Sequence, residues 1–401
     1  MIQVAVFGYG TVGSGVVQVI DENSDLIAAR VGDKLNVKYI LDLRDFPGDK
    51  NEAKVVHDVN IILDDPEVAI ICETMGGDNP AYAYTKSALE KGKCVCTSNK
   101  VVVANHGPEF IQIAKENNCN YLFEASVGGG IPIIRPLNSS LSPEHVDKIM
   151  GILNGTTNYM LTKMSREGAS YDDVLKKAQE LGYAERNPEA DVEGYDACRK
   201  IAILSSLVTG KNVNYEDIYT EGITKITSRD FEYAKKLGKS IKLLAIADNG
   251  DNGLSAMVAP FMIGEEHPLN GVNDVFNAIY VTGNMVDDVM FYGRGAGKLP
   301  TASAVVSDVI ECARNLDRWL PCVWSDETLK LADYKSSKRK FFVRVAMENR
   351  GAVLNQVGPI QEIRICDEEF AFVTTDMTEK TFEDKIKNLQ GILSVIRVEG
   401  N

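Results

Sequence analysis

Residues 1–13 read MIQVAVFGYGTVG, and the fold is decided in this stretch. The run at 2–7 is apolar and rich in valine and isoleucine, as expected of a buried strand. Gly8, Gly10 and Gly13 follow in the spacing GxGxxG, and the residues after them carry apolar side chains at helical intervals. A strand, a glycine turn and a helix in this order predict the first unit of a dinucleotide-binding sheet.

The three glycines have different expected roles. Gly8 permits the tight turn, Gly10 lets the backbone approach a pyrophosphate, and Gly13 lets the helix pack on the strand. The free N–H groups of the first helical turn, at Thr11 and Val12, would meet the negative charge of that pyrophosphate. The predicted cofactor is therefore NAD or NADP. The alternative, a glycine turn that only shapes the backbone, stays open.

The second predicted strand, residues 37–42, ends on Asp42 and is followed closely by Arg44. An acid after the second strand binds the ribose 2′-hydroxyl of NAD, whereas an arginine there meets the 2′-phosphate of NADP. Asp42 lies later than the usual 20 residues after the glycines, so we expect a longer connection before it. The sequence leaves the choice between the two cofactors open.

Strand and helix patterns then alternate, which predicts an α/β fold with a doubly wound parallel sheet. Ligands of such sheets bind beyond the carboxyl ends of the strands. The loop at 73–77, which contains Thr74, and the loop that ends in Lys100 both lie at such positions. Further strands are predicted at 68–73, 93–97 and 120–124, and helices at 80–91 and 106–117.

Length and composition narrow the classes of function. With 401 residues the chain is expected to form two or three domains. A formal net charge of −14 argues against nucleic-acid binding, and no apolar run is long enough to predict a membrane span. The eight scattered cysteines fit reduced thiols, so we expect a cytoplasmic protein.

The middle of the chain holds several polar, glycine-containing segments that composition alone does not explain. The densest is 181–200, LGYAERNPEADVEGYDACRK, where five carboxylates and Tyr183, expected to be buried, precede an apolar helix. The others are EASVGGGIPIIR at 124–135, NGTTNYML at 154–161 and GRGAGKLPTASA at 293–304; strands are predicted at KIMGIL (148–153), 241–247 and 255–263.

Together these segments resemble the homoserine dehydrogenases. The resemblance implies NAD(P)-dependent interconversion of L-homoserine and L-aspartate 4-semialdehyde, in the biosynthesis of threonine, methionine and isoleucine. The matching pieces occur in family order over roughly residues 1–315 and are FGYGTVG, TSNK, EASVGGGIP, GILNGTTNYML, LGYAE with GYDACRK, and GRGAGKLPTASAVVSD.

The resemblance assigns roles within the acidic segment. Lys200 matches the catalytic proton donor, and Asp196, four residues earlier on the same helix face, matches the acid that orients it. The alternative is an exposed surface pair. Lys100 matches a lysine on the cofactor side of the active site. The substrate's amino and hydroxyl ends are assigned to Glu185 and Asp191, and the substrate-binding set also includes Gly155, Thr156 and Tyr183; Glu189 and Glu193 are expected to be surface charges.

The resemblance also implies a structural sodium ion at the turn 124–131. Its oxygen ligands would be the Glu124 carboxylate and the carbonyls of Val127, Gly129 and Ile131, a set that suits a hard cation. A glycine turn that holds no ion is the alternative.

The last part of the chain changes composition. Residues 315–340, with both tryptophans and the basic run KSSKRK, are expected to be a linker. Residues 335–401 show a β-α-β-β-α-β pattern that resembles an ACT regulatory domain with a shortened first helix and second strand, which makes threonine feedback doubtful. The predicted domains are 1–130 (completed by about 293–318) for the nucleotide, 131–292 for substrate binding and dimerisation, and 335–401; a homodimer or homotetramer is expected.

Two other functions remain as alternatives. Another semialdehyde oxidoreductase that uses a cysteine nucleophile would need a reactive thiol, and Cys198 is the only candidate. A non-enzymatic nucleotide sensor with an amino-acid-binding tail would keep the glycine turn but would not need Asp196 and Lys200 together.

Overall fold

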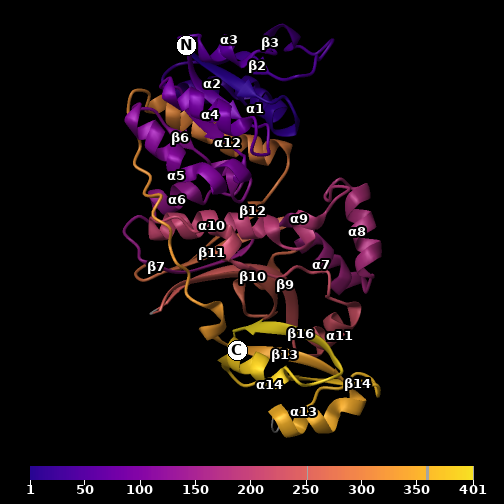
Figure 1. Ribbon diagram of the computed structural model, residues 1–401. Coiled ribbons are helices and arrows are strands. Elements are labelled where there is room, and N and C mark those ends of the chain that lie inside the picture. The colour runs from indigo at the N-terminus through magenta and orange to yellow at the C-terminus, as the bar shows by residue number, and fades with distance from the viewer. Residues whose placement is uncertain (251, 358–360, 401) are drawn as a thin grey trace. The chain divides into compact units, whose positions relative to one another are not determined.

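A computed structural model of the chain describes residues 1–250, 252–357 and 361–400 (Figure 1). These residues form two compact units: the first comprises 1–145, 202–214 and 291–329, and the second comprises 146–201, 215–290 and 330–401. The domain limits predicted from the sequence follow the resemblance to a family and need not coincide with these two units. They therefore stay predictions.

The first unit contains a six-stranded parallel sheet, which confirms the predicted fold class. Its strand order is β3-β2-β1-β4-β5-β6, so the chain runs outward from β1 in one direction and then from β4 in the other. Ligands of such sheets bind where the order reverses, here beyond β1 and β4. The strands are β1 (Ile2–Phe7), β2 (Leu35–Leu41), β3 (Val55–Val56), β4 (Val68–Glu73), β5 (Cys94–Thr97) and β6 (Tyr121–Leu122).

Helix α12 (Lys298–Arg314) returns to this unit from far along the chain and packs on α1 (Thr11–Glu22), beside it in Figure 1. A Cβ on Gly15 would come within 2.9 Å of the Ala302 Cβ, so the close approach of the two helices depends on that glycine. The remaining helices of this unit are α2 (Ser24–Val31), α3 (Val59–Leu63), α4 (Ala81–Glu90), α5 (Lys100–Glu116) and α6 (Ile134–Asn138).

One helix boundary differs from its prediction. We expected residues 97–100 to be a loop and the helix to begin near residue 106, but α5 begins at Lys100. Asn99 caps it, because its side-chain oxygen accepts hydrogen bonds from the N–H groups of Val101 and Val102. Pro108 inside the helix obscured this early start in the sequence.

A mixed sheet of ten strands carries the second unit. Its main order is β12-β11-β7-β9-β10-β16-β13-β14, with β8 on β10 and β15 on β13. The predicted strands at 241–247 and 255–263 are both present, as a hairpin of β9 and β10. The strands are β7 (Val146–Ile152), β8 (Tyr219–Thr220), β9 (Lys239–Gly250), β10 (Gly253–Gly264), β11 (Phe276–Gly283), β12 (Asp287–Arg294), β13 (Lys338–Ala346), β14 (Glu369–Val373), β15 (Met377–Thr378) and β16 (Ile392–Glu399).

Alternate residues of β9 and β10 form the core on one face of this sheet. Leu244 and Ile246 from β9 meet Met257, Ala259 and Phe261 from β10 in one buried cluster, as the two-residue period of a strand requires. The helices of the unit are α7 (Gly155–Glu167), α8 (Tyr171–Glu180), α9 (Glu189–Val192), α10 (Tyr195–Thr209, which runs on past Ile201), α11 (Ser228–Lys236), α13 (Arg350–Val357) and α14 (Glu379–Ile386).

The tail has the predicted β-α-β-β-α-β order, but its first strand begins earlier than expected. Residues 338–340, predicted as part of a linker, belong to β13, because β16 and β15 supply hydrogen-bonding partners for them. The strand after α13 is reduced to a single bridge between Ile363 and Ala371. The second strand of the tail is thus short, as predicted, and consists of this one bridge. Residues 358–360, which precede it, lie outside the described residues.

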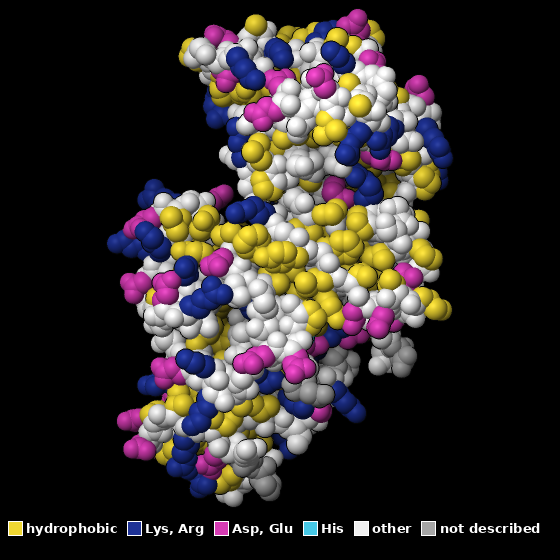
Figure 2. Space-filling view, turned by 180° about the vertical axis from the view of Figure 1, so that it is seen from behind, with side chains coloured by type: hydrophobic (Ala, Val, Ile, Leu, Met, Phe, Trp, Pro, Cys, Tyr) yellow, Lys and Arg dark blue, Asp and Glu magenta, His cyan; other side chains and the backbone are white. Residues whose placement is uncertain are grey.

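Within the described residues, no helix is both long and apolar enough to cross a bilayer. On the face in Figure 2, lysine and arginine side chains are interspersed with aspartate and glutamate rather than gathered into one basic field.

Candidate functional site

The glycine turn between β1 and α1 has a backbone that requires its glycines. Gly8 has a φ of +87°, which is strained for an L side chain. A Cβ on Gly13 would stand 1.8 Å from the Gly8 carbonyl oxygen, whereas a Cβ on Gly10 would meet no atom within 4 Å. The space beside Gly10 is therefore open on the protein side, next to the first turn of α1, where Thr11 and Val12 lie.

The loop after β4 supports this turn. The Thr74 hydroxyl lies 2.9 Å from the carbonyl oxygens of both Phe7 and Gly8, to which it can donate. Glu73 is fully buried, which raises its pKa, and it accepts hydrogen bonds from the Thr97 hydroxyl at 2.6 Å and the Met75 N–H at 2.8 Å. The ends of β1, β4 and β5 are thus held together by side-chain hydrogen bonds.

Asp42 and Arg44 form an ion pair at the end of β2. Two guanidinium nitrogens of Arg44 donate to the Asp42 carboxylate at 2.9 Å each, and the Tyr9 N–H donates to it at 2.8 Å. The Arg44 guanidinium lowers the pKa of Asp42 to about 2, so the carboxylate is ionised at neutral pH. The Arg44 side chain is 63% exposed and remains accessible to a ligand.

A cavity of about 450 Å³ lies over these groups. Its lining includes Gly8, Gly10, Asp42, Arg44 and Thr74. An open glycine backbone at a helix N-terminus, with an acid and a cation at the next strand end, fits the pyrophosphate and ribose of a nicotinamide dinucleotide. This cavity is the candidate cofactor site.

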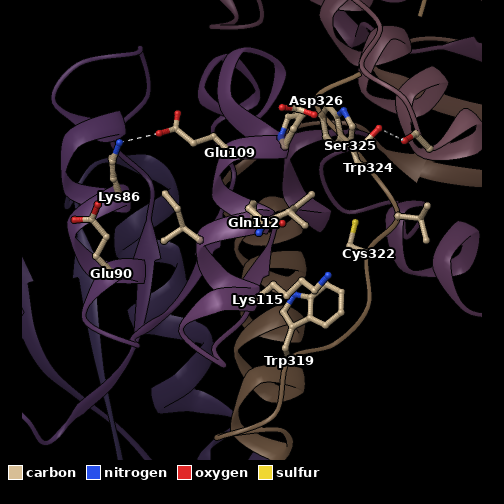
Figure 3. Close-up of a pocket in the computed structure, with 15 residues that line it drawn as sticks. Lys86, Glu90, Glu109, Gln112, Lys115, Trp319, Cys322, Trp324, Ser325 and Asp326 are labelled. Carbon is tan, nitrogen blue, oxygen red and sulfur yellow. Dashed lines mark hydrogen bonds and ion pairs between the residues drawn. The ribbon is translucent and has the colours of Figure 1, made fainter. Parts of the chain in front are cut away.

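A larger cavity, about 660 Å³, lies between α4, α5 and residues 319–326 (Figure 3). The Lys115 amine lies over the Trp319 ring, 5.4 Å from its centre, and Lys86 pairs with Glu109 at 2.8 Å. None of the predicted site residues lines this cavity. Its size therefore does not make it the candidate site.

The predicted pairing of Lys200 with Asp196 is present, and the pair is buried. The Lys200 Nζ donates to Asp196 Oδ2 at 2.7 Å and to the Leu153 carbonyl oxygen at 2.7 Å. Lys200 is 8% exposed and Asp196 is 4% exposed. The alternative of an exposed surface pair is wrong, because helix α10 turns this face toward the end of β7.

Asn154, which the sequence analysis did not single out, connects this pair to a second carboxylate. It lies two residues after the end of β7, is 6% exposed, and donates from Nδ2 to Asp191 at 2.7 Å and to Asp196 at 2.9 Å. Its only signal in the sequence is its position before a helix, which is typical of an ordinary cap. The structure thus brings Asp191, Asp196 and Lys200 together through one amide.

The start of α7 meets the loop after α8. The Thr156 hydroxyl donates to the Tyr183 carbonyl oxygen at 2.6 Å, and the Tyr183 ring packs against Tyr159 with centres 5.1 Å apart. Tyr183 is 44% exposed, so the expectation that it is buried is wrong. A Cβ on Gly155 would come within 2.9 Å of the Val275 carbonyl oxygen, so this turn requires glycine.

The remaining carboxylates of the acidic segment differ in exposure. Glu185 is exposed on the loop that carries Tyr183, and Glu189 is exposed at the start of α9. Glu193 is half-buried beside Gly222. The prediction of a surface charge therefore fits Glu189 but does not fully fit Glu193. Lys100, at the start of α5, is half-buried and belongs to the first unit.

At the turn 124–131 the Glu124 carboxylate caps the start of α6. Its oxygens accept hydrogen bonds from the N–H groups of Ile133, Ile134 and Arg135 at 2.5 to 2.8 Å. Among the hydrogen bonds of the described residues, none ends on the carbonyl oxygens predicted as sodium ligands, those of Val127, Gly129 and Ile131. Carbonyl oxygens are suitable ligands for an alkali cation. The Glu124 carboxylate, in contrast, already accepts hydrogen bonds from backbone N–H groups.

Cys198 does not have the surroundings of a nucleophile. Its thiol is buried, lies 3.3 Å from the Tyr215 carbonyl oxygen and has a pKa raised by burial. A thiol of this kind is structural rather than reactive. The alternative of a cysteine-dependent oxidoreductase loses its candidate residue.

Comparisons with known proteins agree with this geometry. The family model described as "Homoserine dehydrogenase, NAD binding domain" matches residues 8–124, and that described as "Homoserine dehydrogenase" matches residues 132–310. The homoserine dehydrogenase of Bacillus subtilis is 38% identical over an alignment 431 positions long, which covers 100% of this chain and 99% of the relative.

Solved structures extend the likeness to the whole fold. The crystal structure of a homoserine dehydrogenase from Thiobacillus denitrificans matches 99% of this chain and 98% of its own with a TM-score of 0.90 and 34% identity. A hyperthermophilic archaeal homoserine dehydrogenase in complex with NADPH matches with a TM-score of 0.66 and 28% identity, over 80% of this chain and 99% of its own. The chain therefore belongs to the homoserine dehydrogenase family of NAD(P)-dependent oxidoreductases.

Proposed function

We propose that the chain interconverts L-homoserine and L-aspartate 4-semialdehyde and that the buried Lys200–Asp196 pair is its acid–base centre. The observation that carries this proposal is a lysine that is 8% exposed with one carboxylate and one carbonyl oxygen as its partners. Burying such a pair contributes little to stability, because desolvation offsets the attraction of the charges. The buried pair is therefore better explained by a role in proton transfer than by a contribution to stability.

The reaction needs one proton and one hydride. When bound, the nicotinamide cofactor supplies the hydride for reduction and accepts it in oxidation. Lys200 donates a proton from Nζ to the aldehyde oxygen as negative charge develops there. Two of its three N–H groups point to Asp196 and Leu153, which leaves one to reach the substrate oxygen. In oxidation, neutral Lys200 takes the hydroxyl proton.

Two carboxylates of the acidic segment are proposed to recognise the substrate. Glu185 and Asp191 would bind the ammonium and hydroxyl ends of homoserine. Gly155, Thr156 and Tyr183 would form the loop beneath it, supported by the Thr156–Tyr183 hydrogen bond. Lys100 is proposed to act from the cofactor side.

The cofactor is proposed to lie over Gly8, Gly10 and Gly13, with the N–H groups at Thr11 and Val12 facing its pyrophosphate and Thr74 beside the turn. Arg44 is proposed to meet a 2′-phosphate, so that NADP is accepted as well as NAD. The exposure of Arg44 beside an ionised Asp42 supports this proposal. The same Asp42 would bind a free 2′-hydroxyl in NAD.

A sodium ion is proposed at the turn 124–131, held by the carbonyls of Val127, Gly129 and Ile131 with Glu124 beside them. Its role would be to stiffen the turn rather than to take part in the reaction. The absence of protein donors on these carbonyls, among the residues that the structure describes, supports it.

The tail, residues 335–401, is proposed to be a shortened ACT-like domain that packs or pairs rather than binds an effector. The chain is proposed to be a cytoplasmic homodimer or homotetramer. Exposed apolar side chains at the β11–β12 hairpin, Met285 at 80% and Met290 at 43%, support association. Light scattering of a Met290→Glu variant tests it, and an unchanged mass would count against this surface.

The function is tested with initial rates of homoserine oxidation with NAD and with NADP, alongside 4-hydroxybutyrate, which lacks the amino group. We expect a much lower kcat/KM for 4-hydroxybutyrate, because Glu185 would then face no ammonium. Equal kcat/KM values for the two alcohols would contradict the proposed substrate recognition.

A further inference from the structure

Asn154 makes four hydrogen bonds that fix the direction of its amide. On the oxygen side, Oδ1 accepts from the Thr157 N–H at 2.9 Å and from the Thr157 hydroxyl at 3.0 Å. On the nitrogen side, Nδ2 faces Asp191 Oδ1 at 2.7 Å and Asp196 Oδ2 at 2.9 Å. Donors lie on one side and carboxylates on the other, so a flipped amide would face its partners with the wrong groups.

The two carboxylates that Asn154 bridges would repel each other without it. Because they bond the same nitrogen, the Asp191 Oδ1 and Asp196 Oδ2 atoms lie no more than about 6 Å apart. Asn154 gives one N–H to each, which favours the ionised form of both. Asp196 Oδ2 is the same atom that accepts from Lys200 Nζ at 2.7 Å, so the amide acts on the oxygen that holds the lysine.

The chain places Asn154 where it cannot easily move. It lies between the end of β7 at Ile152 and the start of α7, which it caps through Oδ1, so two elements fix its backbone. The neighbouring carbonyl, that of Leu153, is the other acceptor of Lys200 Nζ. Residues 153 and 154 together therefore hold both the lysine and its carboxylate.

We propose that Asn154 is a positioning residue: its amide keeps Asp191 and Asp196 ionised and in place, and thereby sets the position of Lys200. The inference rests on the proposed function of Lys200 and Asp196. Asn154 serves the reaction through these residues and caps α7 as a separate structural role.

Asn154→Asp and Asn154→Ser separate the two roles, because both replacements keep an oxygen that can cap α7 while the amide donor is lost. We expect kcat for homoserine oxidation to fall about 10–100-fold in both, as for other groups that orient a reacting residue. The acid limb of the pH–rate profile should move to higher pH, since a buried carboxylate that loses a donor holds its proton more tightly. Dissociation constants for the cofactor should stay within about twofold of the parent.

The matched control is Thr378→Ala, which removes the side-chain cap of α14 in the tail and touches no site residue. It should lower the thermal midpoint through the lost cap alone, with kcat and the pH profile unchanged. Lys200→Met, measured in parallel, tests the proposed function of Lys200 separately from the role of Asn154.

If Lys200→Met is nearly inactive while both Asn154 variants keep the parent's kcat and pH profile, Asn154 is only a helix cap and the inference alone is overturned. If Lys200→Met keeps the parent's turnover, the proposed function fails and the inference fails with it. A fall in kcat without a shift of the acid limb would also overturn the inference, because it would show lost packing rather than lost control of the carboxylates.

Discussion

Replacing Lys200 by methionine removes the charged group while a stem of similar length remains in the helix. The lost groups are a proton donor and two hydrogen bonds, to Asp196 and Leu153, both at 2.7 Å. The turnover number is expected to fall about 10²–10⁴-fold, the usual effect of losing a general acid or base. This loss corresponds to about 3–5 kcal/mol of transition-state stabilisation.

The same change leaves a buried carboxylate without its cation. Removing one partner of a buried ion pair costs about 3–5 kcal/mol of folding stability, and the bond that Asn154 donates to Asp196 should hold the cost toward the lower end. Loss of the adjacent ammonium favours the protonated carboxyl of Asp196. The variant should therefore be closest to the parent in stability at low pH and should lose stability relative to it as the pH rises.

The assay is kcat for homoserine oxidation at saturating substrate and cofactor, measured well below the thermal midpoint of the variant, with the cofactor dissociation constant measured separately. Glu189→Gln is the matched control, because Glu189 is an exposed carboxylate of the same acidic segment. It should behave like the parent in both measurements. If Lys200→Met turned over homoserine as fast as the parent, the roles of Lys200 and Asp196 would both be wrong.

The remaining predictions concern the cofactor, the substrate and the tail. Gly10→Val should abolish dinucleotide binding in a titration and leave the thermal midpoint close to the parent's, since a Cβ at this position meets no protein atom within 4 Å and would collide with the expected pyrophosphate; retained affinity would place the pyrophosphate elsewhere. Arg44→Ala should raise KM for NADP and spare NAD in initial-rate assays, and equal effects would remove Arg44 from the site. Glu185→Gln should mainly raise KM for homoserine, whereas a pure kcat effect would make it part of the acid–base machinery. Threonine should inhibit weakly or not at all, because the second strand of the tail is reduced to one bridge; strong cooperative inhibition would show that the short tail still binds an effector.

Several features of this chain could be predicted from the sequence because they depend on neighbours in the chain. The strands at 2–7 and 68–73 are apolar runs typical of a sheet that is buried on both faces, and Gly8 and Gly13 are required by the turn itself. The pairing of Asp196 with Lys200 follows from a spacing of four residues on one helix. The resemblance to the family then supplied their proposed roles.

Other features depend on residues that are far apart in the sequence. No local pattern marks Asn154 as more than a cap, and its bonds to Asp191 and Asp196 span 37 and 42 residues. Residues 338–340 resemble a linker by composition, yet they are a strand because β16 and β15 supply partners for them.

By itself, the sequence determined the parallel nucleotide-binding sheet, the glycine turn and the apolar helix that follows the acidic segment, since periodicity and spacing express preferences of the local backbone. Only the tertiary structure decided that the Lys200–Asp196 pair is buried and that one amide holds both neighbouring carboxylates. The reason is physical: burial and hydrogen-bond partners are set by which elements pack together. Here, the end of β7 meets α9 and α10, and no stretch of sequence carries that arrangement alone.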